Sequence, residues 1–249
     1  GTLQESWVPL DDFYREYASL IFTVEADLFI PAGGRPETID GQNWQEFLKP
    51  DGTPSAPVII EGANSFITPQ ARQQLQKAGV ILMRDASANK CGVISSSYEI
   101  IANLLLTEKE FLTNKERYVH DVLEILKKRA SDEARLILRR WHEAAGSQSY
   151  TEISDLISQN INSFYHRLFQ FFTSRPELCL KPPYKAALLR HLPQLLQTES
   201  RFRHRVSRLP TKYLAAVLAA EIGASLVYTS NRDEDFEEMI RRHLARVRA

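Results

Sequence analysis

Two short apolar runs, residues 56–60 and 80–83, constrain the fold of this 249-residue chain most strongly. Each run lacks polar alternation, ends in a polar cluster and is followed at once by a helix start. Such runs are typical of strands in a parallel sheet that helices cover on both faces. A third run, residues 26–31, is ended by Pro31. We therefore predict an α/β fold with a parallel sheet of about three strands.

The polar clusters that end two of the runs are Glu61-Gly-Ala-Asn64 and Asp85-Ala-Ser-Ala-Asn89. Thr68-Pro69 follows the first cluster and predicts a helix, with threonine as its cap and proline as its first residue. Ligands of open α/β sheets bind beyond the carboxyl ends of the strands, where both clusters fall. The pattern therefore predicts one wall of a ligand cleft.

The strand signal stops after Ser96, and apolar residues recur at helical spacing from there on. We predict that residues 107–249 form an all-α C-terminal domain, and that residues 1–106 form a separate domain. Helices are expected to start at Ser131, at the capping-box pattern of residues 149–152, at Pro182-Pro183 and at Pro210. The last expected helix spans residues 233–247.

Composition favours an ordinary globular protein, with zero net charge, 43% hydrophobic and 25% charged residues. Residues 1–106 hold 7 Lys/Arg against 13 Asp/Glu, and the remainder 24 against 18. These opposite charges either help the two parts dock or only mark two different surfaces. Because the net charge is zero, we expect no nucleic-acid partner and no membrane partner, and we also expect no signal peptide. Cys91 and Cys179 form neither a disulfide framework nor a metal motif, so we expect a reducing, cytoplasmic location.

Four strings occur in a collinear order over residues 26–100: Ala26-Asp-Leu-Phe-Ile-Pro-Ala32, Glu61-Gly-Ala-Asn64, Thr68-Pro69, and Asp85-x-x-Ala-Asn89-x-x-Gly-Val93-x-x-Ser96. Together they resemble the amino-acid dehydrogenases. More narrowly, Gly33-Gly-Arg-Pro-Glu37, Ser65-Phe-Ile-Thr68 and Asp85-Ala-Ser-Ala-Asn-Lys90 look like the large NAD-specific glutamate dehydrogenases. The resemblance implies that residues 1–106 are the C-terminal half of a Rossmann-type dinucleotide-binding domain and residues 107–249 a helical extension.

The resemblance also implies roles for individual residues. Hydride transfer needs a cofactor that is held rigidly against the substrate, and neutral amides can orient its carboxamide. A serine at a helix start, next to free backbone N–H groups, would suit the side-chain carboxylate of glutamate. The implied NAD-binding residues are Pro31, Ala32, Asn64 and Asn89, and the implied substrate-binding residues are Val93 and Ser96.

The implied reaction is the oxidative deamination of L-glutamate to 2-oxoglutarate and ammonia, with hydride transfer to NAD. No Gly-x-Gly-x-x-Gly follows any strand, and the family's proton-transfer lysine and aspartate have no counterpart, because Lys90 is not that lysine. We therefore assign no catalytic residue and no metal. We expect a C-terminal fragment of a homo-oligomeric enzyme, inactive alone. This chain also has Cys91-Gly92 at the positions where related enzymes commonly have two glycines.

Plainer interpretations stay open. Asn64 and Asn89 can be helix caps, Ser96 a polar helix start, and Glu61 and Asp85 only capping or bridging groups. A separation of Asn64 from Asn89 above about 15 Å would exclude one shared ligand.

Other classes of function compete with the enzyme fragment. The helical part alone could be a non-catalytic module for oligomerisation or regulation. No Gly-x-Ser-x-Gly surrounds Ser96, which argues against a serine hydrolase. The basic run Arg201–Arg208 is most simply a solvated face or a contact to an acidic neighbour.

Overall fold

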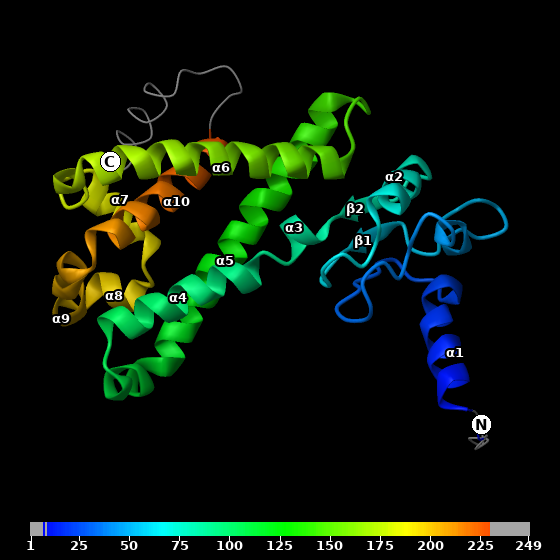
Figure 1. Cartoon of the computed structure of the whole chain (residues 1–249), viewed down its shortest axis with the longest axis horizontal. Helices are drawn as coiled ribbons and strands as arrows, with labels where there is room; N and C mark the ends of the chain where they lie inside the picture. The colour runs from blue at the N-terminus through cyan, green and yellow to red at the C-terminus, as the bar shows by residue number, and fades with distance from the viewer. Residues whose placement is uncertain (1–6, 8, 230–249) are drawn as a thin grey trace. The chain divides into compact units, whose positions relative to one another are not determined.

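The computed structural model describes residue 7 and residues 9–229. The chain divides into two compact units. Unit 1 comprises Gly1–Asn89 with Ser149–Thr151, and unit 2 comprises Lys90–Gln148 with Glu152–Ala249. Figure 1 shows the helices and strands of both units.

Unit 1 contains a parallel pair of strands, β1 (Val58–Ile60) and β2 (Ile81–Met83), with Ile59 opposite Leu82. Helix α2 (Pro69–Lys77) connects them, as βαβ units require. The Thr68 side chain accepts a hydrogen bond from the Ala71 N–H at 3.3 Å, and Pro69 is the first helical residue. The predicted start of this helix is confirmed.

The third predicted strand, residues 26–31, makes only an isolated parallel bridge between Phe29 and Ile59. The Phe29 N–H donates to the Val58 carbonyl, and the Phe29 carbonyl accepts from the Ile60 N–H. The next rung would need an N–H at position 31, which proline lacks. The α/β class holds for unit 1, whereas the three-stranded Rossmann-type sheet is not confirmed.

The core of unit 1 lies around the strands, with Phe47, Ile59, Leu75 and Leu82 fully or almost fully buried. Phe47 belongs to the short 3-10 helix η1 (Trp44–Phe47). Helix α1 (Leu10–Thr23), which the sequence analysis did not identify, packs Ile21 and Phe22 against this core.

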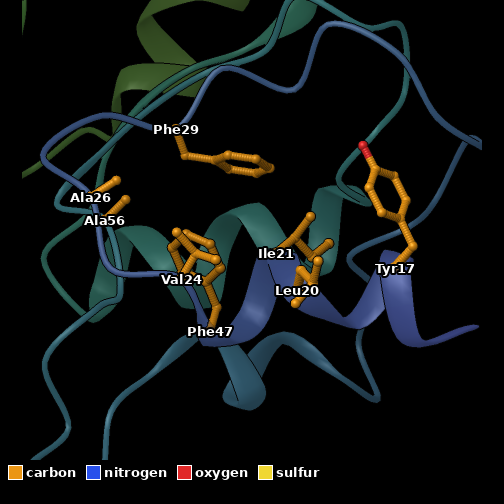
Figure 2. A pocket seen from close by; sticks show the side chains of 8 residues that line it. All are labelled: Tyr17, Leu20, Ile21, Val24, Ala26, Phe29, Phe47 and Ala56. Atoms are coloured by element: carbon orange, nitrogen blue, oxygen red, sulfur yellow. The ribbon is translucent and has the colours of Figure 1, made fainter. Parts of the chain in front are cut away.

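An apolar pocket of about 260 Å³ opens between α1 and the segments around Phe29 and Phe47. Figure 2 shows Leu20 and Val24 on its wall. The side chains that line it are apolar apart from the phenol of Tyr17, so the pocket offers few groups to orient a polar reactant.

The described part of unit 2 consists of helices joined by short turns and contains no strand. Its α-helices are α4 (Cys91–Leu105), α5 (Glu108–Ala144), α6 (Tyr150–Ser174, less its first two residues), α7 (Tyr184–His191), α8 (Gln194–Thr198), α9 (Ser200–Arg203) and α10 (Thr211–Thr229). Two 3-10 helices, η2 (Pro176–Leu178) and η3 (His204–Arg208), join them. The helical prediction for residues 107 onward is confirmed as far as Thr229. The predicted helix at residues 233–247 lies outside the described residues.

Helix α5 corrects one predicted boundary. Ser131 was expected to open a new helix, but α5 runs unbroken through it from a capping box formed by Thr107 and Glu110. Asp132 forms an ion pair with Lys128, one turn earlier in the same helix, and does not lie in the first turn of a new helix. The prediction at Ser131 is wrong because the acidic pair after it serves contacts along the helix.

The contact boundary between the units falls after Asn89, earlier than the predicted domain boundary at 106/107. Helix α4 accounts for the difference, because Tyr98, Ile101 and Leu105 are buried in the helical core. The assignment of residues 1–106 to a dinucleotide-binding domain stays a prediction. No helix within the described part of the chain is long and apolar enough to cross a membrane.

Candidate functional site

Asn64 and Asn89 come together beyond the carboxyl ends of the two strands. Asn64 follows β1 in the loop that begins at Glu61, and Asn89 ends the short helix α3 (Asp85–Ala88) that follows β2. The Asn89 amide Nδ2 donates to Asn64 Oδ1 at 2.5 Å and to the Gly62 carbonyl at 3.3 Å. This separation is far below the limit of about 15 Å for a shared ligand. We call Asn64 and Asn89 the asparagine pair.

Pro31 and Ala32 lie against the same loop. The Pro31 carbonyl accepts from the Ala63 N–H at 2.6 Å. A Cβ at Gly62 would stand 3.2 Å from the Pro31 oxygen and 3.5 Å from Ala32 Cα, so glycine permits this close approach. All four residues predicted to contact NAD therefore gather at one edge of unit 1.

The two predicted substrate residues lie on α4, in unit 2. Val93 is 80% exposed, and the Ser96 hydroxyl donates to the Gly92 carbonyl one turn earlier. Helix α4 begins at Cys91, so Ser96 lies in its second turn and has no free backbone N–H groups beside it. The expected helix start at Ser96 is wrong, and its contact with a carboxylate stays a prediction that must rest on the hydroxyl alone.

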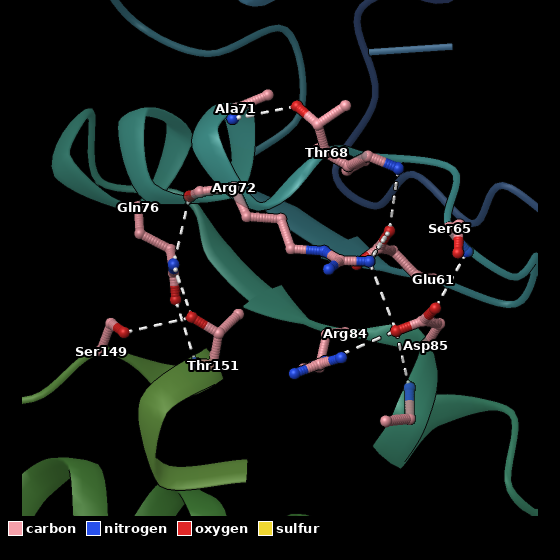
Figure 3. Close-up of polar contacts among 12 residues, drawn as sticks. Glu61, Ser65, Thr68, Ala71, Arg72, Gln76, Arg84, Asp85, Ser149 and Thr151 are labelled. Carbon is pink, nitrogen blue, oxygen red and sulfur yellow. Dashed lines mark hydrogen bonds and ion pairs between the residues drawn. The ribbon is translucent and has the colours of Figure 1, made fainter. Parts of the chain in front are cut away.

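A buried ion-pair network supports the loop that carries Asn64 (Figure 3). Arg72 of α2 donates from Nε to Glu61 Oε2 at 2.7 Å and from Nη2 to Glu61 Oε1 at 3.0 Å. The same Nη2 also approaches Asp85 Oδ1 at 3.3 Å, and Arg84 lies 3.5 Å from that oxygen. Glu61 is fully buried and Arg72 is 6% exposed, so the network belongs to the interior of unit 1.

The pKa values of the two carboxylates of this network are shifted in opposite directions. Desolvation raises the pKa of Glu61 above its ordinary value, although the hydrogen bonds and charge of Arg72 oppose the rise. Desolvation also acts on Asp85, but N–H groups of Ser65 and Ala86 and the charges of Arg72 and Arg84 outweigh it and lower its pKa. Asp85 is therefore ionised at neutral pH and serves as a fixed acceptor.

The capping or bridging roles considered for Glu61 and Asp85 are therefore present in the structure. Arg72 was missed, because it stands among glutamines in a helix whose sequence resembles a solvated face. Its one available signal was its place in α2 between two acidic residues that end neighbouring strands. No group of three or more His, Cys, Asp or Glu suited to a metal occurs within the described residues.

Comparison with known proteins places the chain in a family. Residues 9–157 match the Glutamate/Leucine/Phenylalanine/Valine dehydrogenase family, and the chain belongs to it. This match covers all the predicted NAD-binding and substrate-binding residues. The asparagine pair therefore lies in the part of the chain that matches the dehydrogenase family.

Several curated proteins that are similar to this chain carry the name NAD-specific glutamate dehydrogenase. The chain is 33% identical over 216 residues to a probable NAD-specific glutamate dehydrogenase of Schizosaccharomyces pombe, covering 82% of this chain and 19% of that protein. It is 35% identical over 214 residues to the NAD-specific glutamate dehydrogenase of Neurospora crassa, covering 81% and 20%. The Saccharomyces cerevisiae NAD-specific glutamate dehydrogenase is 31% identical over 229 residues, covering 85% and 20%. The chain thus spans about a fifth of these relatives, and no solved structure matches it significantly.

Proposed function

We propose that this chain forms part of an NAD-dependent glutamate dehydrogenase, which deaminates L-glutamate to 2-oxoglutarate and ammonia. The observation that carries the proposal is the asparagine pair beyond two parallel strands, in a chain of the dehydrogenase family. The names of its relatives support glutamate as substrate and NAD as cofactor. The cytoplasmic location and the homo-oligomeric parent enzyme belong to the same proposal.

The polar groups of the asparagine pair fit a nicotinamide carboxamide. Asn89 uses Nδ2 toward Asn64 and Gly62, and no bond within the described residues occupies its Oδ1 or the Asn64 Nδ2. One acceptor and one donor group therefore remain on adjacent side chains. A carboxamide presents the complementary donor and acceptor, so these groups fit it.

NAD, when bound, supplies the hydride acceptor of the reaction. The role of this chain is to orient the nicotinamide, with Asn64 and Asn89 on the carboxamide and Pro31 and Ala32 beside the dinucleotide. Val93 and Ser96 are proposed to contact the substrate. No residue of the chain is assigned a proton-transfer role, so we propose that the chain alone is inactive.

Calorimetric titration of the whole chain with NAD tests the proposed contacts. Replacing either Asn64 or Asn89 by alanine removes about one hydrogen bond and should weaken binding by roughly threefold to tenfold. Asn162→Ala, at an exposed position on α6, is the matched control and should bind as the wild type does. Unchanged affinity in both site variants would contradict the assignment.

An activity assay tests the incomplete site. The chain, NAD and L-glutamate should yield no NADH absorbance above the background without protein. Sustained turnover that scales with protein concentration would show that the chain holds its own proton-transfer groups, and would refute this part of the proposal.

An apolar groove supports oligomerisation or regulation as a second function. It has a volume of about 720 Å³ between α4 and α5, and includes Phe111, Val119 and Leu123. Val119 and Leu123 are exposed, as interface residues are before assembly. Size exclusion of the full chain with light scattering is the test, and a strictly monomeric mass at high concentration counts against self-assembly.

A further inference from the structure

We propose that Asp85, held in place by Arg72, is the positioning residue of the asparagine pair, and that it acts through the backbone of Ser65. Its importance for NAD rests on the function proposed above. The geometric claim, that Asp85 keeps Asn64 against Asn89, concerns unit 1 alone.

Ser65 is the residue that needs to be held. Its φ of +54° lies in the left-handed region, which side chains other than glycine rarely adopt. Two hydrogen bonds fix it there: the Ser65 N–H donates to Asp85 Oδ2 at 2.9 Å, and the Ser65 carbonyl accepts from the Glu37 N–H at 2.7 Å. Because Asn64 directly precedes Ser65, this backbone turn sets the direction of the Asn64 side chain.

Asp85 is also bonded to the helix that carries the other asparagine. Its Oδ1 accepts from the Ala86 N–H at 2.8 Å, and its carbonyl accepts from the Asn89 N–H at 2.9 Å across the single turn of α3. One residue therefore contacts the backbone next to Asn64 and the backbone of Asn89. No other residue within the described part of the chain bonds both ends in this way.

Arg72 and Glu61 hold the Asp85 carboxylate from the interior. Arg72 pairs with both carboxylates, and Glu61 Oε1 accepts from the Ile67 N–H at 3.1 Å. Glu61 therefore joins the two buried ends of the loop from Glu61 to Ile67, and Asp85 holds the exposed middle of the loop at Ser65 (Figure 3). Strain that surrounding bonds over-determine in this way is typical of functional sites.

The role of Asp85 is separable from ordinary stabilisation, because glycine adopts a left-handed φ without strain. Asp85→Ala removes the acceptor for the Ser65 N–H, so Ser65 should relax and move Asn64 away from Asn89. Adding Ser65→Gly to that variant should restore the turn. Asp85→Asn keeps a neutral oxygen acceptor, and serves as a second variant if Asp85→Ala does not fold.

The experiment measures two properties of each full-chain variant. The first is the nuclear Overhauser contact between the Asn89 side-chain amide and Asn64, recorded without ligand. The second is the dissociation constant for NAD. Amide signals of β1 and β2 report whether unit 1 remains folded.

Asp85→Ala should lose the contact and bind NAD roughly threefold to tenfold more weakly, as expected for the loss of about one aligned hydrogen bond. Asp85→Ala with Ser65→Gly should regain both. Asp85→Asn should keep more of each than Asp85→Ala.

Retention of the contact in a folded Asp85→Ala variant would overturn the proposal. A folded double variant that regains neither property would also overturn it. If the wild type binds no NAD but the contact follows the expected order, the positioning proposal stands and the proposed function loses its cofactor contact.

Discussion

Replacing Arg72 by methionine should destabilise unit 1 more than any change at its surface. Arg72→Met would leave the Glu61 carboxylate, which is fully buried, without the two hydrogen bonds and the charge that Arg72 supplies. An unpaired buried charge of this kind costs about 3–5 kcal/mol of unfolding free energy. Lys49→Met is the matched control within unit 1, because its ion pair with Glu25 lies at the surface and should contribute less than about 1 kcal/mol.

Hydrogen exchange resolved to the peptides that contain β1 and β2 measures the opening free energy of unit 1 directly. A double variant, Glu61→Leu with Arg72→Met, should recover part of the loss, since it removes the unpaired buried carboxylate, although the Ile67 N–H loses its acceptor and Asp85 loses one partner. The reasoning would be refuted if Arg72→Met left protection of β1 and β2 within about 1 kcal/mol of wild type. It would also fail if the double variant were less stable than the single one.

Three further outcomes follow from other parts of the fold. The Arg205 hydrogen bond and the Thr107 N–H lower the pKa of Glu110 to about 2, so Glu110 stabilises the folded chain above pH 4.5 and loses this effect as the pH falls toward 2. Denaturant midpoints of wild type and Glu110→Gln should therefore differ at pH 7 and converge in acid; a constant gap would contradict the ion pair. Gly223→Ala should destabilise α10 by about 1 kcal/mol, because the new Cβ would lie 3.3 Å from a backbone nitrogen of α6, whereas Gly92→Ala on α4 meets nothing within 4 Å and should stabilise by about 0.5 kcal/mol. Equal denaturant midpoints for these two variants would count against the close approach of α10 to α6. Leu82→Ala, at a fully buried position in β2, should cost about 2–5 kcal/mol in the same assay, and a cost below about 1 kcal/mol would contradict its place in the core.

Local chemistry made several elements predictable from sequence. Thr68-Pro69 marks a helix start because a cap and a missing N–H act within one turn, and the apolar runs at residues 58–60 and 81–83 form paired strands whose central residues, Ile59 and Leu82, are fully buried. The convergence of Asn64 and Asn89 followed from the rule for the carboxyl ends of parallel strands.

The remaining features depend on contacts that sequence spacing does not reveal. Pro31 ends a run of strand-forming residues, yet whether its missing N–H faces the neighbouring strand is decided only by the register. Arg72 has an ordinary helical context, and its importance comes from the buried Glu61 opposite. Ser131 and the two acidic residues after it have the pattern of a helix cap, but α5 continues through them. Ser96 was expected at a helix start, but α4 already begins at Cys91.

The central claim is that the asparagine pair forms part of a nicotinamide site, and mapping NAD onto the chain tests it most directly. Backbone and side-chain amide shifts recorded during a titration with NAD should change first at Ala32, at the loop from Gly62 to Ser65 and at Asn89. The same titration of Asn89→Ala should give smaller changes at that loop. Shifts confined to other surfaces of the chain, or shifts at the loop that Asn89→Ala leaves unchanged, would contradict the account.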